Sequence, residues 1–230
     1  MEKHSISFVF PMYNEADNIE EAVDRASGLA RELSEDYEII VVDDGSTDGC
    51  GAIVDDLADD DAHIKSIRLA KNTKFGGALA KGLVSASKDV IIYTDSDFPV
   101  KEDDIRKALA LLEGADIVSG YSLVIKDASF KRIIMSKGYN FLVHLLFGLE
   151  LHDINSGFKI YKREIFKDLT LRSKSPFIDA EIFLEAFKRK FVIRQYGLVF
   201  ELRTRGKSFI SKPSIVARTF WDMLAYRFSR

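Results

Sequence analysis

The 230-residue sequence is poor in cysteine and in long apolar runs, and each shortage excludes a class of protein. Its one cysteine, Cys50, excludes an intrachain disulfide and favours a reducing compartment. The longest apolar run, residues 141–149, is too short to span a bilayer and contains His144. No N-terminal stretch resembles a signal peptide. We therefore expect a cytoplasmic chain without a transmembrane anchor.

The sequence also lacks internal repeats, low-complexity segments and obvious linkers, so we expect a single domain over residues 1–230. Its 47% hydrophobic and 30% charged residues are typical of a soluble globular protein. The net charge of −3 is unevenly placed, because residues 1–120 hold 12 Lys and Arg against 26 Asp and Glu, and residues 121–230 hold 21 against 10. This imbalance predicts two surfaces with different partners, although solvated faces that differ by chance would give the same counts.

Apolar runs alternate with helical periodicities in the first half, which predicts an α/β fold with a mostly parallel sheet and helices on both faces. The expected strands of this half are 5–10, 37–42, 64–69, 90–93 and 116–119. The expected helices are 18–34, 51–59, 75–86 and 101–113. In the second half we expect helices over 131–147, 178–190 and 214–228, and strand-like runs within 192–202.

Three of the predicted strands end in polar clusters, PMYNE at 11–15, DDGSTD at 43–48 and DSD at 95–97. The carboxyl ends of parallel strands share one edge of a sheet, so the clusters should converge there. Their carboxylates would repel one another unless a cation lay among them, and hard oxygen ligands suit Mg²⁺ or Mn²⁺. Asp95 and Asp97 are one residue apart, so on an extended chain both can approach one ion. A lone D-x-D occurs by chance in acidic loops, but here it follows a buried strand.

The segments FVFPMYNEADNIE, EIIVVDDGSTDG and YTDSDFP together resemble the motifs of the family 2 glycosyltransferases, which have the GT-A fold. Four later segments, FKRIIMSKGYNFL, HDINSGFKIYKREIF, FIDAEIFLEAF and ELRTRGKSF, are similar to those of the polyprenyl-phosphate hexose synthases, such as the dolichol-phosphate mannose and glucose synthases. The resemblance implies a Rossmann-like GT-A domain. Residues 1–120 would bind the nucleotide sugar, and residues 121–230 would bind the acceptor and end in an amphipathic helix.

The same resemblance implies an inverting, metal-dependent transfer of a hexose to a polyprenyl phosphate, with GDP-mannose favoured over UDP-glucose as donor. Mg²⁺ or Mn²⁺ would lie on Asp95 and Asp97. The family often has a metal-assisting Gln two positions after the D-x-D, where this chain has Pro99. The predicted nucleotide-sugar contacts are Pro11, Tyr13, Glu15, Asp43, Asp44, Asp95, Ser96, Asp97, Arg203 and Arg205.

Two segments of the first half have a structural alternative to nucleotide contact, and the second of them is not among the predicted contacts. Residues 43–46 could form a turn and a helix cap, because Asp, Gly and Ser favour both. The Gly76-Gly77 pair, with Lys71 and Lys74, could lie against the nucleotide or only permit close packing. Both alternatives stay open at the level of sequence.

On the acceptor side, the resemblance implies that Arg132, Ser136 and Lys159 bind the lipid phosphate. Arg132 could instead be a solvated helix residue. The predicted catalytic residues are Asp95, Asp97, Asp153 and Arg203, and the acidic pair Asp179 and Glu181 is expected near the acceptor. The family often has an Arg after a Gly-Ser pair, but this chain has Gly120-Tyr121-Ser122 there. The family's Ser-Lys is Ser208-Phe209 here, so Lys207 is the candidate to replace that lysine.

A lipid phosphate is already an anion at neutral pH, so the transfer needs no general base. Catalysis can rest on positioning the reactants and stabilising the leaving diphosphate. A hydroxyl acceptor would need a base, for which Asp153 and Asp179 are the candidates.

The last predicted helix offers a way to reach a membrane. Its stripe of Ala217, Phe220, Trp221, Leu224 and Phe228, with the nearby charges of Arg218, Arg227 and Arg230, is typical of an interfacial helix, although the stripe could equally pack on the core or on a partner. We expect the chain to be peripheral at the inner face of the membrane, alone or with a membrane-anchoring partner. Nucleic acid is not an expected partner.

Two other functions would fit part of the sequence. One is a family 2 transferase that uses UDP-glucose or UDP-N-acetylglucosamine, or acts on a cell-surface saccharide. The basic second half and the motifs RIIMSKG and DINSGFK count against a saccharide acceptor. The other is a nucleotide-binding regulatory module without catalysis, against which the intact D-x-D and Arg203-x-Arg205 count.

Overall fold

A computed structural model of the chain describes residues 4–124, 130–201 and 213–229, apart from the side chains of 130–132. Within these residues a seven-stranded sheet has the order β3-β2-β1-β4-β6-β5-β7. β6 is antiparallel to β4 and β5, and the other pairings are parallel, which confirms the mostly parallel sheet. The strands are β1 (Ile6–Met12), β2 (Tyr37–Asp43), β3 (Ile64–Arg68), β4 (Val90–Thr94), β5 (Ile117–Ser122), β6 (Phe158–Lys162) and β7 (Ile193–Leu198).

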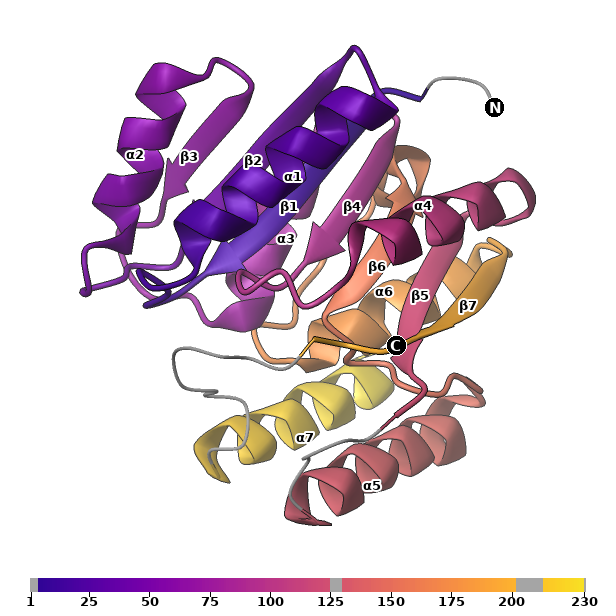
Figure 1. The fold of residues 1–230 in the computed structure, drawn as a ribbon. Coiled ribbons are helices and arrows are strands. Elements are labelled where there is room, and N and C mark those ends of the chain that lie inside the picture. Colours follow the sequence, from indigo (N-terminus) through magenta and orange to yellow (C-terminus); the bar gives the residue numbers. More distant parts are fainter. Residues whose placement is uncertain (1–3, 125–129, 202–212, 230) are drawn as a thin grey trace.

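Helices cover both faces of this sheet, as predicted (Figure 1). Side chains alternate along β1, so Phe8 and Phe10 join the core under α1, α2 and α4, while Val9 joins the core under α3 and α6. Both cores are fully buried and aliphatic-rich, which explains the continuous apolar runs in the sequence. The helices are α1 (Ile19–Leu33), α2 (Cys50–Asp60), α3 (Phe75–Ser85), α4 (Glu102–Ala110), η1 (Leu111–Gly114), α5 (Phe130–Phe147), η2 (Arg163–Phe166), α6 (Phe177–Lys188) and α7 (Pro213–Phe228).

The strand β6 is absent from the sequence prediction. Its sequence, FKIYK, has two lysines and no continuous apolar run. It nevertheless forms a strand between β4 and β5, because Phe158 and Ile160 enter one core while Tyr161 enters the other. The buried position of Lys159 on this strand bears directly on the site described below.

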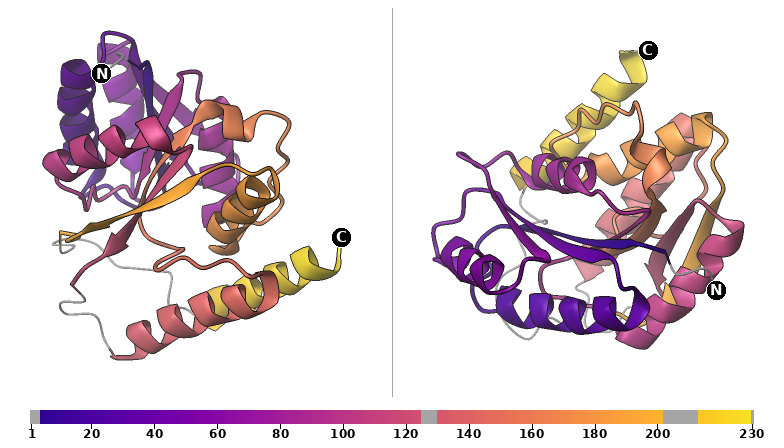
Figure 2. Two further views of the ribbon diagram at one scale, coloured as in Figure 1. Left: turned by 90° about the vertical axis from the view of Figure 1, so that its right-hand side faces the viewer. Right: turned by 90° about the horizontal axis from the view of Figure 1, so that it is seen from above.

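The helices α5 and α7 lie side by side beyond the edge where the parallel strands end (Figures 1 and 2). Their contact includes the rings of Phe147 and Tyr226, whose centroids are 5.7 Å apart. Asp222 fixes α7, because its Oδ2 accepts hydrogen bonds from Ser173 Oγ at 2.9 Å and Ser175 N at 3.2 Å. α7 therefore docks through a buried carboxylate rather than through its apolar stripe.

Candidate active site

The three polar strand ends meet at one edge of the sheet, as the sequence predicts. β1 lies between β2 and β4, and all three run in the same direction. The backbone N–H of Asp44 donates to Met12 O at 2.9 Å, and Ser96 Oγ donates to Pro11 O at 2.7 Å. These bonds join the end of β1 to the segments after β2 and β4.

The D-x-D segment follows β4 with its two carboxylates partly exposed and the serine between them buried. Asp95 is held from three directions. Its N–H donates to Gly157 O at 3.1 Å, its backbone O accepts from Phe98 N at 2.9 Å, and its Oδ1 accepts from Tyr93 Oη at 2.8 Å. This arrangement leaves Asp95 little freedom to turn away from the edge.

Tyr93 and Gly157 are neighbours of Asp95 that sequence reasoning missed. Burial raises the pKa of Tyr93 well above its usual value, and the nearby charge of Asp95 adds to this, so the phenol stays protonated and can donate. A Cβ on Gly157 would lie 2.3 Å from Asp95 Oδ2, so only glycine leaves room for that carboxylate. A signal was present in the sequence, because Gly157 lies in the family-like DINSGFK segment.

The two carboxylates fit a divalent cation. They supply hard oxygen atoms on one short, anchored segment, and the lack of a Cβ at Gly157 leaves space beside Asp95 Oδ2. Among the described residues, no group of three or more His, Cys, Asp or Glu side chains is arranged to hold a metal. Two protein carboxylates are sufficient for Mg²⁺ when water and substrate phosphates complete its shell.

Asp43 and Asp44 both make structural contacts at the end of β2. Asp44 is 3% exposed, and its Oδ1 accepts from Thr73 N at 2.6 Å and Thr73 Oγ1 at 2.7 Å. Burial raises the pKa of Asp44, and the bonds from Thr73 partly offset this. Asp43 Oδ1 accepts from Ser46 N at 2.9 Å, which closes a turn. The turn is thus observed, whereas the cap is not, because the N-cap residue of α2 is Gly49 and no side chain caps the helix. Nucleotide contact by these residues stays a prediction.

The loop after β1 is tied to the loop after β2. Asn14, at φ 56°, receives a hydrogen bond from Thr47 N at 2.8 Å on its Oδ1 and donates its N–H to Ser46 Oγ at 2.9 Å. Tyr13 is 36% exposed beside this junction, whereas Glu15 is buried and accepts from Asn18 Nδ2 at 2.7 Å. Tyr13 is therefore the accessible ring of the first polar cluster.

At the start of α3 the packing interpretation of the glycines is observed. Gly76 N donates to Lys174 O at 3.0 Å, and a Cβ on Gly76 would lie 2.6 Å from Ser173 O. A Cβ on Gly77 would lie 2.4 Å from Thr73 Oγ1. Both glycines are needed for close approach, whatever else lies near them.

Behind the D-x-D lies a fully buried ion pair, in which Lys159 Nζ is 3.0 Å from Asp179 Oδ1. The ammonium also donates to Ser156 O at 2.6 Å and lies 5.2 Å from the centroid of the Tyr93 ring. Burial raises the pKa of Asp179 to about 6, Lys159 opposes this rise, and the charges of Asp95 and Asp153 add to it. The structure therefore gives Lys159 a protein partner, and its contact with an acceptor phosphate stays a prediction.

The remaining acceptor-side residues are spread over several elements. Asp153 is partly exposed in the turn before β6, and Ser136 is exposed on α5. Glu181 is buried and accepts from Ser173 N at 2.8 Å, so it fixes the loop before α6. The side chain of Arg132 and all of Arg203 and Arg205, with Lys207 and Ser208, lie outside the described residues.

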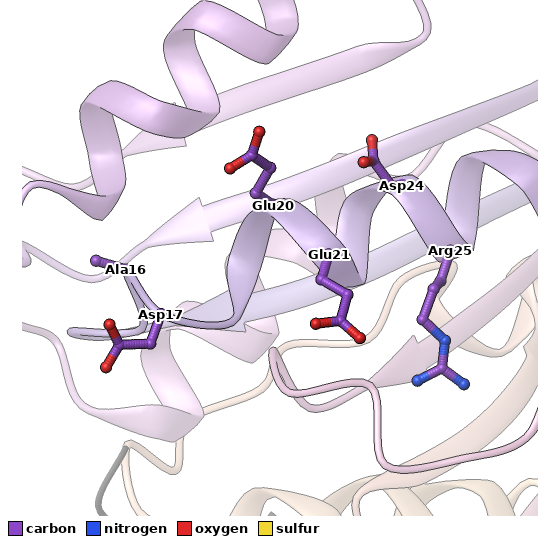
Figure 3. Close-up of a pocket in the computed structure, with 6 residues that line it drawn as sticks. All are labelled: Ala16, Asp17, Glu20, Glu21, Asp24 and Arg25. Atoms are coloured by element: carbon purple, nitrogen blue, oxygen red, sulfur yellow. The ribbon is translucent and has the colours of Figure 1, made fainter. Parts of the chain in front are cut away.

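An acidic groove of about 300 Å³ lies along α1 and was not predicted (Figure 3). The D-x-D does not line it. Arg25 stands at one end, and its guanidinium reaches the loop after the D-x-D. The residues that line the groove are Ala16, Asp17, Glu20, Glu21, Asp24 and Arg25.

Comparison with known proteins gives a family match. Residues 7–170 match the model of glycosyl transferase family 2. The chain is 26% identical to polyprenol monophosphomannose synthase of Mycolicibacterium smegmatis, over 90% of this chain and 81% of the relative. It is 30% identical to undecaprenyl-phosphate 4-deoxy-4-formamido-L-arabinose transferase of Yersinia pestis, over 75% of this chain and 54% of the relative. Glycosyltransferase AglD of Haloferax volcanii is 29% identical over 95% of this chain, which spans only 37% of that relative.

A solved structure supports the predicted fold. Glucosyl-3-phosphoglycerate synthase of Mycobacterium tuberculosis, in complex with Mn²⁺, UDP and phosphoglyceric acid, superposes with a TM-score of 0.72. The match covers 97% of this chain and 78% of the other at 22% identity. The predicted GT-A fold is confirmed, and at this identity the likeness concerns the fold alone.

Proposed function

The chain belongs to glycosyl transferase family 2, and from that premise we propose that it moves a hexose from a nucleotide sugar to a polyprenyl phosphate. One observation carries the proposal. The D-x-D carboxylates lie at the C-terminal edge of the sheet, with Asp95 fixed by Tyr93 and Gly157. An edge of this kind is where open α/β sheets bind ligands.

Asp95 and Asp97 would hold Mg²⁺ or Mn²⁺, which when bound would take up negative charge on the leaving diphosphate. The protein's own residues would orient the donor. Tyr13 is exposed enough to contact the base, and Pro11 and Asp44 lie at the adjoining strand ends. Arg203 and Arg205 are proposed diphosphate contacts on their sequence motif alone.

The acceptor is proposed to be a polyprenyl phosphate because two relatives carry such an acceptor in their names. An anionic phosphate attacks without a general base, so the expected mechanism is a single inverting displacement at the anomeric carbon. Arg132 and Ser136 are the proposed phosphate contacts on α5. Asp153, in the turn beside Gly157, is proposed to orient the reacting sugar.

Lys159 has a different proposed role. Its ammonium is fully buried against Asp179, so we assign it to holding β6 and the Ser156-Gly157 turn in place beside Asp95. A direct contact with the acceptor phosphate would require this pair to open.

GDP-mannose is the proposed donor and UDP-glucose the alternative. The relatives use different sugars by name, a mannose and a formamido-arabinose, so they do not decide this. The preference for mannose rests on the resemblance of several sequence motifs alone.

The proposed location is the cytoplasmic membrane surface. No helix among the described residues has the length and apolarity needed to cross a membrane. However, α7 docks through Thr219, Asp222 and Met223, and its opposite side leaves Trp221 66% and Phe228 80% exposed. The adjacent α5 exposes Ile134, Phe141 and Leu145. Such a face suits a lipid interface, with or without an anchoring partner.

A transfer assay tests the proposal. Radiolabelled GDP-mannose, UDP-glucose and UDP-N-acetylglucosamine are each incubated with a short polyprenyl phosphate, with Mn²⁺ or with EDTA. We expect label in the lipid phase from one donor, only with metal, and loss of that label in Asp97→Asn. Metal-dependent nucleotide binding without a lipid product would contradict the acceptor assignment and favour a saccharide acceptor.

A further inference from the structure

The loop that follows the D-x-D is held in a conformation that its sequence would not favour. Phe98 has φ 43°, a region that bulky residues rarely adopt, and its side chain is only 1% exposed. Its ring packs 6.2 Å from that of Phe10. Strain of this kind persists only where the surroundings impose it, and it is common at functional sites.

Arg25, on the central part of α1, supplies much of that restraint. Its Nη1 donates to Phe98 O at 3.1 Å, and its Nη2 donates to Val100 O at 3.3 Å. Its Nε donates to Glu102 Oε1 at 2.7 Å. The guanidinium also lies 4.4 Å from the centroid of the Phe98 ring. A planar fork with several fixed donors can make these contacts at once.

Glu201, in the segment after β7, also binds this loop. Its N–H donates to Pro99 O at 2.8 Å, and its Oε2 accepts from Arg25 at 3.2 Å. Three successive carbonyls, those of Phe98, Pro99 and Val100, thus receive donors from α1 or from the segment after β7. A short loop with all three carbonyls bound is fixed in place although Pro99 offers neither an N–H nor a side-chain ligand.

We propose that Arg25 is a positioning residue for the D-x-D site, which it supports by clamping residues 98–100. Phe98 is the residue after Asp97, and its N–H bonds back to the carbonyl of Asp95, so movement of this loop moves both carboxylates. The inference rests on the proposed metal site and does not depend on the identity of the sugar or acceptor. Arg25 also lines one end of the acidic groove, where its proposed role is structural support rather than ligand binding.

The test compares Arg25→Ala and Arg25→Lys with Arg106→Ala. Arg106 is a matched control because it also joins α4 to α1, through Glu32 at 2.6 Å, and pairs with Asp103 at 2.7 Å, so its hydrogen bonds and ion pairs go to these two residues rather than to residues 98–100. Two properties are measured for each variant without acceptor. One is the affinity for Mn²⁺ in the presence of GDP or UDP, and the other is the hydrogen exchange of a peptide covering residues 95–101.

We expect Arg25→Ala to speed exchange in that peptide and to weaken Mn²⁺ binding by about tenfold or more, the usual effect of losing support around a metal site. Arg25→Lys keeps the charge but not the fork, so it should rescue only part of the affinity. Arg106→Ala should match the wild type in both measurements. Arg25→Lys also keeps the test decisive if Arg25→Ala folds poorly.

Wild-type Mn²⁺ affinity in both Arg25 variants, or an equal loss in Arg106→Ala, would overturn the inference. So would a wild-type protein that binds no Mn²⁺ with either nucleotide, because Arg25 would then have no metal site to support. Failure of the proposed transfer reaction is a separate result. If the transfer reaction fails but the wild type binds Mn²⁺ with nucleotide, the comparison of the Arg25 variants with Arg106→Ala still tests the inference.

Discussion

At the scale of single residues, the orientation of Asp95 in the candidate site depends on two uncharged neighbours. Asp95 can be identified from its D-x-D motif, but its orientation is set by the Tyr93 hydroxyl and by the missing side chain of Gly157. The sequence places Gly157 in a motif without indicating that it touches Asp95. That contact arises because β6 pairs with β4, a pairing that local patterns do not predict.

Gly157→Ala should weaken metal binding without unfolding the protein. The new Cβ would lie 2.3 Å from Asp95 Oδ2, so the carboxylate must turn away from its position. We expect Mn²⁺ affinity in the presence of nucleotide to fall by about tenfold or more, as for other losses of support around a metal site. Calorimetric titration with Mn²⁺ measures the change.

Gly28→Ala is the control, because a Cβ at Gly28 meets nothing within 4 Å. In the helix α1 it should raise stability by up to about 1 kcal/mol and leave Mn²⁺ binding unchanged. If Gly157→Ala binds Mn²⁺ as the wild type does, the carboxylate of Asp95 is not the ligand that we propose.

The buried pair of Lys159 and Asp179 predicts a pH-dependent stability. Burial raises the folded pKa of Asp179 to about 6, above its ordinary value, so its contribution to stability is greatest at low pH and is lost as pH rises toward 6. In Lys159→Met the opposing cation is gone, and the pKa of Asp179 should rise further. The loss in free energy of unfolding of Lys159→Met relative to the wild type should therefore grow above pH 6. It should grow by up to about 1.4 kcal/mol per pH unit until the new pKa of Asp179 is reached.

Urea unfolding at pH 5.5 and pH 8 measures this deficit. The matched control is Lys162→Met on the same strand, which removes a partly exposed ion pair with Asp116 at 2.8 Å. Burial tends to raise the pKa of Asp116, but the hydrogen bonds from Lys162 and Val192 outweigh it, so the pKa is lowered. The stability that this ion pair contributes is therefore already constant above about pH 5, and it should be about 1 kcal/mol or less. Equal deficits for Lys159→Met at both pH values would show that Asp179 does not titrate as stated.

At the scale of elements, the sequence predicts most of the fold, because strand and helix periodicities are local. The strand at 37–42 and the helix at 18–34 differ from the observed β2 and α1 by only a residue at their ends. β6 is missed because its pattern is short and interrupted by Lys159, whose burial depends on Asp179, 20 positions later on α6. Lysine is rarely buried, so the burial of Lys159 could not be predicted from the sequence, where the family resemblance alone suggested a phosphate contact.

The helix α7 is predicted nearly in full by its periodicity, but the side that it turns to the core is decided by contacts with distant residues. The apolar stripe of α7 allowed packing on the core or on a membrane. The structure turns the stripe outward, because Asp222 is buried and bonded to the loop at 173–175, and Met223 enters the core. No local rule would place a carboxylate on the docking side of that helix.

At the scale of the whole molecule, the helices α5 and α7 and the candidate metal site share one end of the sheet. α5 and α7 lie beyond the edge at which β1, β2 and β4 end (Figure 1). A lipid phosphate in a membrane under these helices would therefore face the D-x-D rather than the opposite end of the sheet. The basic residues Lys137, Arg218 and Arg227 are exposed on the same two helices and would add attraction to anionic lipid.

The chain should bind vesicles that contain anionic lipid, and its single tryptophan can report this. Trp221 is 66% exposed on α7, so its fluorescence emission should shift to the blue when the helix enters the interface. Leu145→Ser removes apolar area worth about 1.5–2 kcal/mol if it is buried in lipid, so vesicle affinity should fall by about tenfold. Val84→Ser is a matched control, because Val84 and Leu145 are both 65% exposed but Val84 lies on α3. A Trp221 spectrum unchanged by vesicles, or equal losses in the two variants, would mean that these helices do not bind lipid.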